Sequence, residues 1–258
     1  MLTSFADLKG RQVKPPSHWD PFRSAYPQVM AAVTTAAGLF SLATVFLPDV
    51  TRFAVQHIYA FLHEASHTLI AILGQGKITA ISLDPTGGGH TLVSVSGPLH
   101  DVLVTGAGLV LPAWLSAWLL VNAITRQRIE ATLLILGLAT AYLSYRYIDA
   151  TPEVTMSLYG FAGFCFLVAF LPTGGLIKAT GAFLVAFVIA SGVLQSLDYA
   201  WLQWIDNDIT RPTDSQNIAD RLHLDGIQEI ALSLLILMGL GYSVAGLLAW
   251  NWLQRYRD

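Results

Sequence analysis

The sequence predicts an all-α polytopic membrane protein with six to eight transmembrane helices and one small β-hairpin. The first reason is composition: of 258 residues, 54% are hydrophobic and only 12% are charged, whereas a soluble domain carries about 25% charged residues. The mean hydropathy of +0.55 agrees. A soluble core of this length could not bury so many apolar side chains, so lipid is the expected solvent.

The second reason is the spacing of long apolar stretches, because a helix needs about 20 apolar residues to cross the hydrocarbon. We count seven spans, and the fourth is short and can extend back over Glu130. They lie at residues 28–47, 53–73, 102–124, 131–145, 154–177, 179–197 and 230–254. The chain therefore divides into a polar amino-terminal tail (1–27), a membrane domain (28–254) and a short carboxy-terminal tail (255–258).

Two connections carry more than linker sequence. Residues 75–96 alternate apolar and polar side chains around Pro85 and the glycines 87–89, which predicts a β-hairpin with a glycine-rich turn. Residues 198–226 contain six aspartates. The hairpin segment has too few continuous apolar residues to be a further span.

Charge and cysteine content exclude several classes of protein. The net charge of −3 and the isoelectric point near 6.1 give no sign of a nucleic-acid partner. The one cysteine, Cys165, lies inside an apolar run, so neither a disulfide framework nor a cysteine-based metal site is expected. Because residues 1–27 are polar, we also expect no removable signal peptide.

The second span contains an HExxH motif, formed by His63, Glu64 and His67. Residues four apart lie on one helical face, so the two histidines can bind one zinc ion. Glu64 lies one residue further round, where a carboxylate can act as general base towards metal-bound water. Three ionisable groups so close together in a membrane helix are costly and usually mark function. The alternative is a polar patch that bonds to neighbouring spans.

This region resembles the site-2 protease-like intramembrane zinc metalloproteases, and in particular their compact bacterial branch. The resemblance covers the motif, the Gly-containing turn and hairpin, the start of the third span and a late Asp signature, at residues 63–67, 74–77, 87–91, 106–113 and 213–219. It implies a multi-pass protein of the bacterial inner membrane, with Zn²⁺ as cofactor and a membrane-protein or peptide substrate in the lipid bilayer. The hairpin of that family is thought to receive an unwound substrate strand, here on residues 78–83 or 91–95.

The third zinc ligand is open at the level of sequence. Asp214, between Thr213 and Ser215, matches the compact branch, and we favour it. Asp225, in Leu224-Asp225-Gly226, matches the broader family, although the Asn-Pro that usually accompanies it there is missing. Asp220 and His223 are weaker candidates.

Three further histidines receive smaller roles. His57 lies on the face of Glu64 and either supports the site or packs through hydrogen bonds. His90 is expected to be a turn residue, and His100 with Asp101 to form an interfacial pair.

The leading function is hydrolysis of a peptide bond at membrane depth. A non-proteolytic scaffold or assembly subunit that keeps the fold is the alternative, although the intact Glu64 argues against it. A transporter would need further charges within the other spans, and these are almost free of them.

Overall fold

Proline marks the start of three helices in this protein. Pro48, Pro98 and Pro152 each stand in the first turn of a helix, where the missing N–H costs no hydrogen bond and the fixed φ suits the helix. The computed structural model describes residues 25–126, 128–172, 175–205, 214–222 and 227–254. Within these ranges the helices are α1 (Ala25–Phe46), α2 (Pro48–Leu73), α3 (Pro98–Thr125), α4 (Ile129–Tyr147), α5 (Pro152–Phe170), α6 (Gly175–Ile205), α7 (Asp214–Leu222) and α8 (Ile227–Gln254).

The seven long helices follow the seven apolar stretches, and the predicted helical membrane fold with a hairpin is confirmed. Two boundaries were wrong. The sixth span was expected to end at residue 197, but α6 continues to Ile205. The fifth span was expected to reach residue 177, but α5 ends at Phe170 and α6 begins at Gly175. Leu171 has extended backbone angles because the following Pro172 disfavours the helical conformation. The fourth helix starts at Ile129 and includes Glu130.

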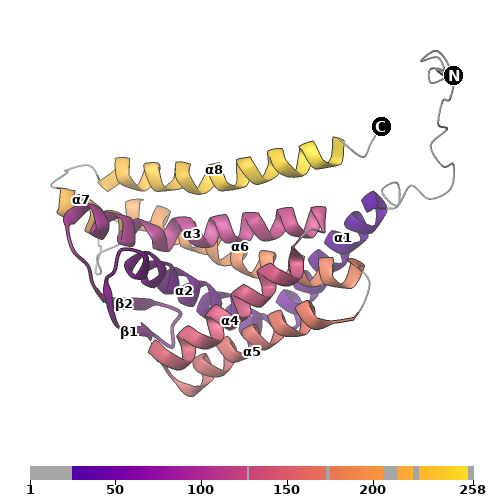
Figure 1. Ribbon diagram of the computed structural model, residues 1–258, viewed down its shortest axis with the longest axis horizontal. Coiled ribbons are helices and arrows are strands. Elements are labelled where there is room, and N and C mark those ends of the chain that lie inside the picture. Colours follow the sequence, from indigo (N-terminus) through magenta and orange to yellow (C-terminus); the bar gives the residue numbers. More distant parts are fainter. Residues whose placement is uncertain (1–24, 127, 173–174, 206–213, 223–226, 255–258) are drawn as a thin grey trace, which may run out of the picture.

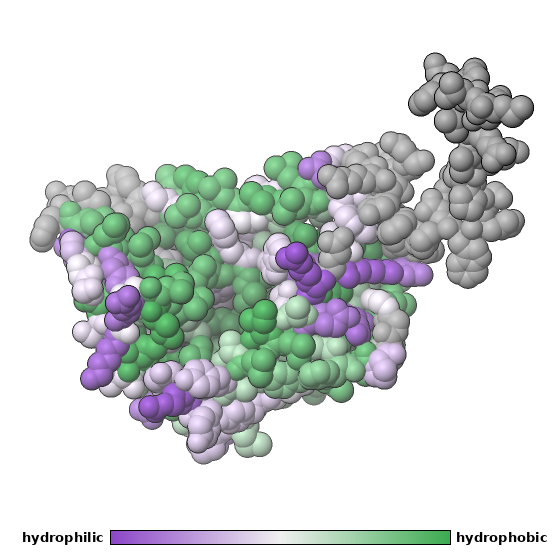
Figure 2. Space-filling model, in the orientation of Figure 1, coloured by the Kyte–Doolittle hydropathy of each residue, from purple (hydrophilic) through white to green (hydrophobic). Residues whose placement is uncertain are grey.

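Among the described residues, five helices are long and apolar enough to cross a membrane by length and composition alone, within α1, α3, α5, α6 and α8. This number is below the expected six to eight, because α2 and α4 carry more polar and charged residues. Asp49, Arg52 and Glu64 lie in α2, and Glu130 and Arg146 lie in α4. The chain is a multi-pass integral membrane protein. Figure 2 shows a face that is largely apolar, with hydrophilic residues near its ends.

Helix α2 can hold polar residues because protein surrounds much of it. It contacts α3, α6, α5, α1 and two strands. Its buried residues include His57, Glu64, Ser66, His67 and Thr68. Charged and polar groups at membrane depth are tolerated when they face the protein interior. Helix α8 is different: it runs along the outside of α3 (Figure 1) and contacts mainly α3 and α7.

The sheet has three strands, β1 (Lys77–Leu83), β2 (Gly89–Ser94) and β3 (Ile148–Asp149), in the order β2-β1-β3. Strands β1 and β2 form the predicted antiparallel hairpin, with Leu83 opposite Gly89. The third strand was not predicted from the sequence, because it is only two residues long. It pairs in parallel with β1 at Ile81 and Ser82 only, so this part of β1 has a strand on each edge, whereas among the described residues β2 has a strand on one edge only.

His57 fastens the hairpin to α2. Its imidazole nitrogens lie 2.8 Å from the carbonyl oxygen of Phe53 and 3.2 Å from that of Asp84, and the side chain is buried. Of the two roles considered for His57, the structure therefore supports hydrogen-bonded packing. The hairpin lies at the same end of the molecule as α7 (Figure 1).

Candidate metal centre

His63 and His67 lie one turn apart on α2 and present their rings to the same side. The ring centroids are 4.8 Å apart and the planes are nearly perpendicular, at 84°. At a rise of about 1.5 Å per residue, His67 lies about 9 Å from the end of α2. The two imidazoles are thus inside the bundle but close to the end at which the hairpin and α7 lie.

Asp214, the first residue of α7, brings a carboxylate to these rings. Its Oδ2 lies 3.1 Å from Nε2 of His63 and 3.7 Å from Nε2 of His67. One ligand atom from each of the three residues lies within 4.8 Å of the other two. Asp214 follows His67 by 147 positions in the sequence, and the fold brings its carboxylate to both histidines.

Helix α7 is held on α3 by one apolar face and one ion pair. Ile218 and Ala219 are buried, and the side chain of Ile218 lies over Gly106 of α3. One turn further along, Arg221 forms an ion pair with Asp101 and donates a hydrogen bond of 3.1 Å to Thr105. These contacts fix the first turn of α7, and with it Asp214.

Helix α3 approaches the two imidazoles closely because residue 108 is glycine. A methyl group on Gly108 would lie 2.5 Å from Cε1 and Nε2 of His67 and 2.7 Å from Cε1 of His63. One turn earlier, the carbonyl of Val104 accepts a hydrogen bond of 2.6 Å from Nδ1 of His67. This bond places the proton of a neutral His67 on Nδ1 and leaves the Nε2 lone pair facing Asp214.

Glu64 is buried beside the cluster but is not one of its three members. Its Oε2 accepts a hydrogen bond of 2.7 Å from the hydroxyl of Thr91 on β2. The neighbouring Gly89 lies so close that a methyl group on it would be 3.0 Å from Cγ of Glu64. The hairpin therefore covers one side of the Glu64 side chain.

A model of the family described as Peptidase M50B-like matches residues 31–249. The chain belongs to the Peptidase M50B-like family. No curated protein matches the chain, and no solved structure does. The match extends over the HExxH helix, the hairpin and α7, so this M50B-like chain is a membrane protein of a metalloprotease family.

The residues of this M50B-like centre suit a zinc ion. Oδ2 of Asp214 is buried and has no hydrogen-bond partner among the described residues, although two imidazole nitrogens lie close by. Ligand atoms about 2.0 to 2.1 Å from a tetrahedral ion are about 3.3 Å apart, and the distances of 3.1 and 3.7 Å lie on either side of that value. The three ligand atoms lie within 4.8 Å of one another, so small movements of the side chains would bring all three to one cation.

The electrostatics of Asp214 agree with a ligand role. Burial raises the pKa of its carboxyl group, but the imidazoles of His63 and His67 in their protonated forms, together with the charge of Arg221, outweigh burial and hold that pKa below its ordinary value. The carboxylate is therefore ionised at neutral pH, the form in which it binds a metal.

The sequence offered three other candidates for the third ligand. Asp225 and His223 fall outside the described residues. Asp220 is exposed on α7 and is not part of the cluster. Within the part of the chain that the structure describes, His63, His67 and Asp214 are the one group of three or more His, Cys, Asp or Glu placed to share an ion.

His90 and His100 take no part in the cluster. His90 is exposed and pairs with Ser82 across the hairpin, so it is a strand residue and not the expected turn residue. His100 lies 3.1 Å from the carbonyl oxygen of Ile70 near the end of α2, while Asp101 pairs with Arg221. The expected pair between His100 and Asp101 is therefore replaced by contacts with two different helices.

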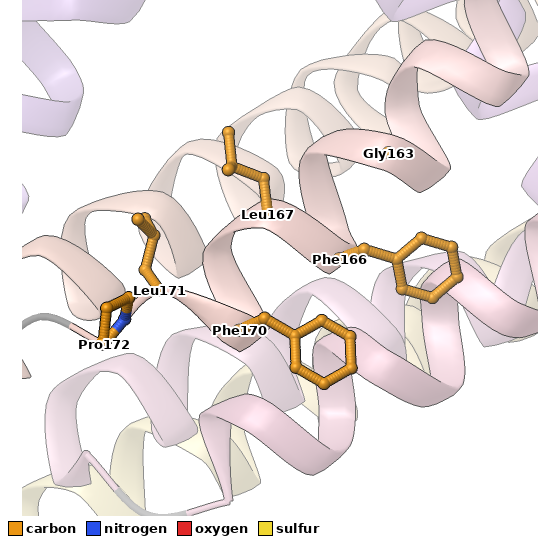
Figure 3. Close-up of a pocket in the computed structure, with 6 residues that line it drawn as sticks. All are labelled: Gly163, Phe166, Leu167, Phe170, Leu171 and Pro172. Atoms are coloured by element: carbon orange, nitrogen blue, oxygen red, sulfur yellow. The ribbon is translucent and has the colours of Figure 1, made fainter.

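A hollow of about 440 Å³ on α5 is unrelated to this chemistry (Figure 3). Its lining is Gly163, Phe166, Leu167, Phe170, Leu171 and Pro172, and none of these side chains can bind a metal or transfer a proton.

Three features of the centre were not found from the sequence: the contact of Gly108 with both rings, the bond from Thr91 to Glu64, and the pair of Arg221 with Asp101. The glycine-rich opening of the third span was a signal for the first. The other two join residues far apart in the chain, and the sequence holds no signal for them.

Proposed function

We propose that this chain is an intramembrane zinc metalloprotease that hydrolyses a peptide bond of a membrane-associated substrate. The observation that carries the proposal is the convergence of His63, His67 and Asp214 next to the buried carboxylate of Glu64. Two histidines and a carboxylate, with one position left for water, form a ligand set of catalytic zinc sites. The bacterial inner membrane is the proposed location.

Four residues of the chain have separate roles in the proposed reaction. His63, His67 and Asp214 would hold the ion, which when bound would polarise the scissile carbonyl and acidify a water molecule. Glu64 accepts a proton from the attacking water as its oxygen bonds to the carbonyl carbon. Glu64 then delivers that proton to the amine nitrogen as the C–N bond breaks, so that an amine and a carboxylic acid, which keeps the second proton of the water, are released.

The substrate segment must be extended, because a helix hides its peptide bonds. Of the two strands considered for receiving it, we favour β2, because among the described residues it has a strand on one edge only, whereas β1 pairs with β2 on one edge and, at Ile81 and Ser82, with β3 on the other. Main-chain pairing along the free edge of β2 would place an added strand beside Glu64, which β2 already contacts.

The test uses the full chain reconstituted in liposomes with a fluorescently labelled single-span membrane protein as substrate. The span of that substrate carries a central Gly-Pro pair, so that it unwinds readily. We expect one zinc ion per chain by elemental analysis, cleavage by the wild type, and loss of cleavage on chelation with recovery on added zinc. His63→Ala is expected to lose the metal.

Two outcomes would contradict the proposal. If the purified protein holds no zinc even after zinc is supplied, the three residues do not form a zinc site. Stoichiometric zinc without cleavage of this substrate or of a panel of such spans would favour the scaffold alternative.

A further inference from the structure

The hydroxyl of Thr91 contacts the side chain that would act as general base. Its Oγ1 lies 2.7 Å from Oε2 of Glu64 and 3.1 Å from the backbone oxygen of the same residue. A hydroxyl has one hydrogen to donate. The side-chain oxygen is the nearer of the two acceptors, so Thr91 donates to Oε2.

The backbone oxygen of Glu64 does not depend on Thr91. The hydroxyl of Thr68, one turn along α2, donates to it over 3.0 Å. Thr68 and Thr91 therefore bond to the same residue, one to its main chain and the other to its carboxylate. Removing the Thr68 hydroxyl therefore tests support of helix α2, and removing the Thr91 hydroxyl tests orientation of the Glu64 carboxylate.

Gly89 restricts the same side chain from a second position on β2. Gly89 and Thr91 are two residues apart and so face the same side of the strand, which is the side against α2. A methyl group on Gly89 would lie 3.0 Å from Cγ of Glu64 and 2.8 Å from Cδ2 of Leu83. Strand β2 therefore contacts one side of Glu64 at two points, Cγ beside Gly89 and Oε2 at Thr91.

We propose that Thr91 is a positioning residue: its hydroxyl holds Oε2 of Glu64 so that Oε1 is free to exchange the proton of the reaction. The proposal rests on the proposed function of Glu64 as general base. A glutamate side chain has three rotatable bonds and loses conformational freedom when it is ordered, so a carboxylate fixed before substrate binds needs no further ordering in the transition state.

The same strand has a second role under this proposal. Strand β2 holds the base through Thr91 and also keeps the free edge for a substrate strand. A substrate paired with β2 would therefore be aligned with the strand that orients Glu64. Specificity for an extended segment and orientation of the base would follow from one element.

The experiment compares Thr91→Val, Thr91→Ser and the matched control Thr68→Val in the liposome assay. Valine keeps the shape of threonine and removes the hydroxyl, whereas serine keeps the hydroxyl. For Thr91→Val we expect unchanged zinc content, a KM within about twofold of wild type, and a kcat lowered about two- to tenfold, the size expected for the loss of one hydrogen bond. Thr91→Ser should recover most of kcat, and Thr68→Val should keep it.

A second readout does not depend on cleavage. Infrared difference spectra, each taken against the same protein with Glu64→Gln, isolate the carboxylate stretch of Glu64. We expect this band to shift in Thr91→Val and to stay in place in Thr91→Ser and Thr68→Val. If the wild type binds zinc but cleaves nothing, the proposed function fails, and the infrared comparison still decides whether Thr91 holds the carboxylate.

Three results would overturn the proposal for Thr91. One is an unchanged kcat and an unmoved carboxylate band in Thr91→Val. Another is an equal loss of kcat in Thr91→Val and Thr68→Val. The third is a rise in KM alone, which would make Thr91 an anchor of the hairpin, as His57 is.

Discussion

Gly108 of α3 lies directly against the imidazole of His67. A methyl group built on its Cα would come within 2.5 Å of Cε1 and Nε2, closer than real side chains approach. This contact lets α3 close over both histidines, and it places the Val104 carbonyl where it accepts from Nδ1 of His67. The backbone of one helix thus orients the ligands of another.

The first prediction follows from this contact. Gly108→Ala should displace both imidazoles and lower the affinity for zinc by about 10- to 100-fold, the range seen when the groups that orient a ligand are changed. Gly106→Ala is the matched control on the same helix, because a methyl group there would make ordinary contacts of 3.5 and 3.9 Å. Competition with a fluorescent chelator measures both affinities, and equal affinities would contradict the account.

Glu64→Gln should retain zinc and the fold but lose cleavage by about 100-fold or more, because general-base catalysis contributes about 10² to 10⁴. Glutamine has nearly the same shape and can still accept the hydrogen bond from Thr91, but it cannot take a proton. Zinc content and turnover are measured on the same preparation. Undiminished turnover would remove Glu64 from the mechanism.

Asp214→Ala should remove the third ligand and lower zinc content after dialysis, since catalytic zinc normally keeps three protein ligands. Asp220→Ala is a matched control on α7, because that carboxylate is exposed. Asp225→Ala is the decisive comparison. Loss of zinc in Asp225→Ala with retention in Asp214→Ala would transfer the ligand role to Asp225.

The ion pair of Arg221 with Asp101 should hold α7 in place for Asp214. Both side chains are partly exposed, at 40% and 33%, and such pairs contribute about 0.2 to 1 kcal/mol. Arg221→Ala or Asp101→Ala should therefore weaken zinc binding by about 1.4- to fivefold, and the double variant should weaken it no further than Arg221→Ala alone.

Lys178→Ala provides the comparison for this ion pair. It removes another partly exposed ion pair, with Glu130 at 2.8 Å, which joins α6 to α4. Zinc affinity should be unchanged in Lys178→Ala. A similar loss in this variant would mean that general destabilisation lowers the affinity.

The sequence by itself determined the membrane class, the positions of the seven long helices, the hairpin and the HExxH motif. Each of these depends on local chemistry. Apolar runs of about 20 residues seek the hydrocarbon, alternation with a glycine-rich turn gives a hairpin, and residues four apart share a helical face. The resemblance to the site-2 protease-like family also favoured Asp214 as the third zinc ligand, but it left Asp225 as an alternative.

Only the tertiary structure decided what meets His63 and His67. Asp214 reaches them because Ile218 packs on α3 and Arg221 pairs with Asp101, and neither contact can be inferred from spacing along the chain. The pairing of β3 with β1 leaves β2 as the free edge, and Thr91 of that strand meets Glu64. Such contacts depend on how separate elements pack, and local sequence determines the elements more strongly than their packing partners.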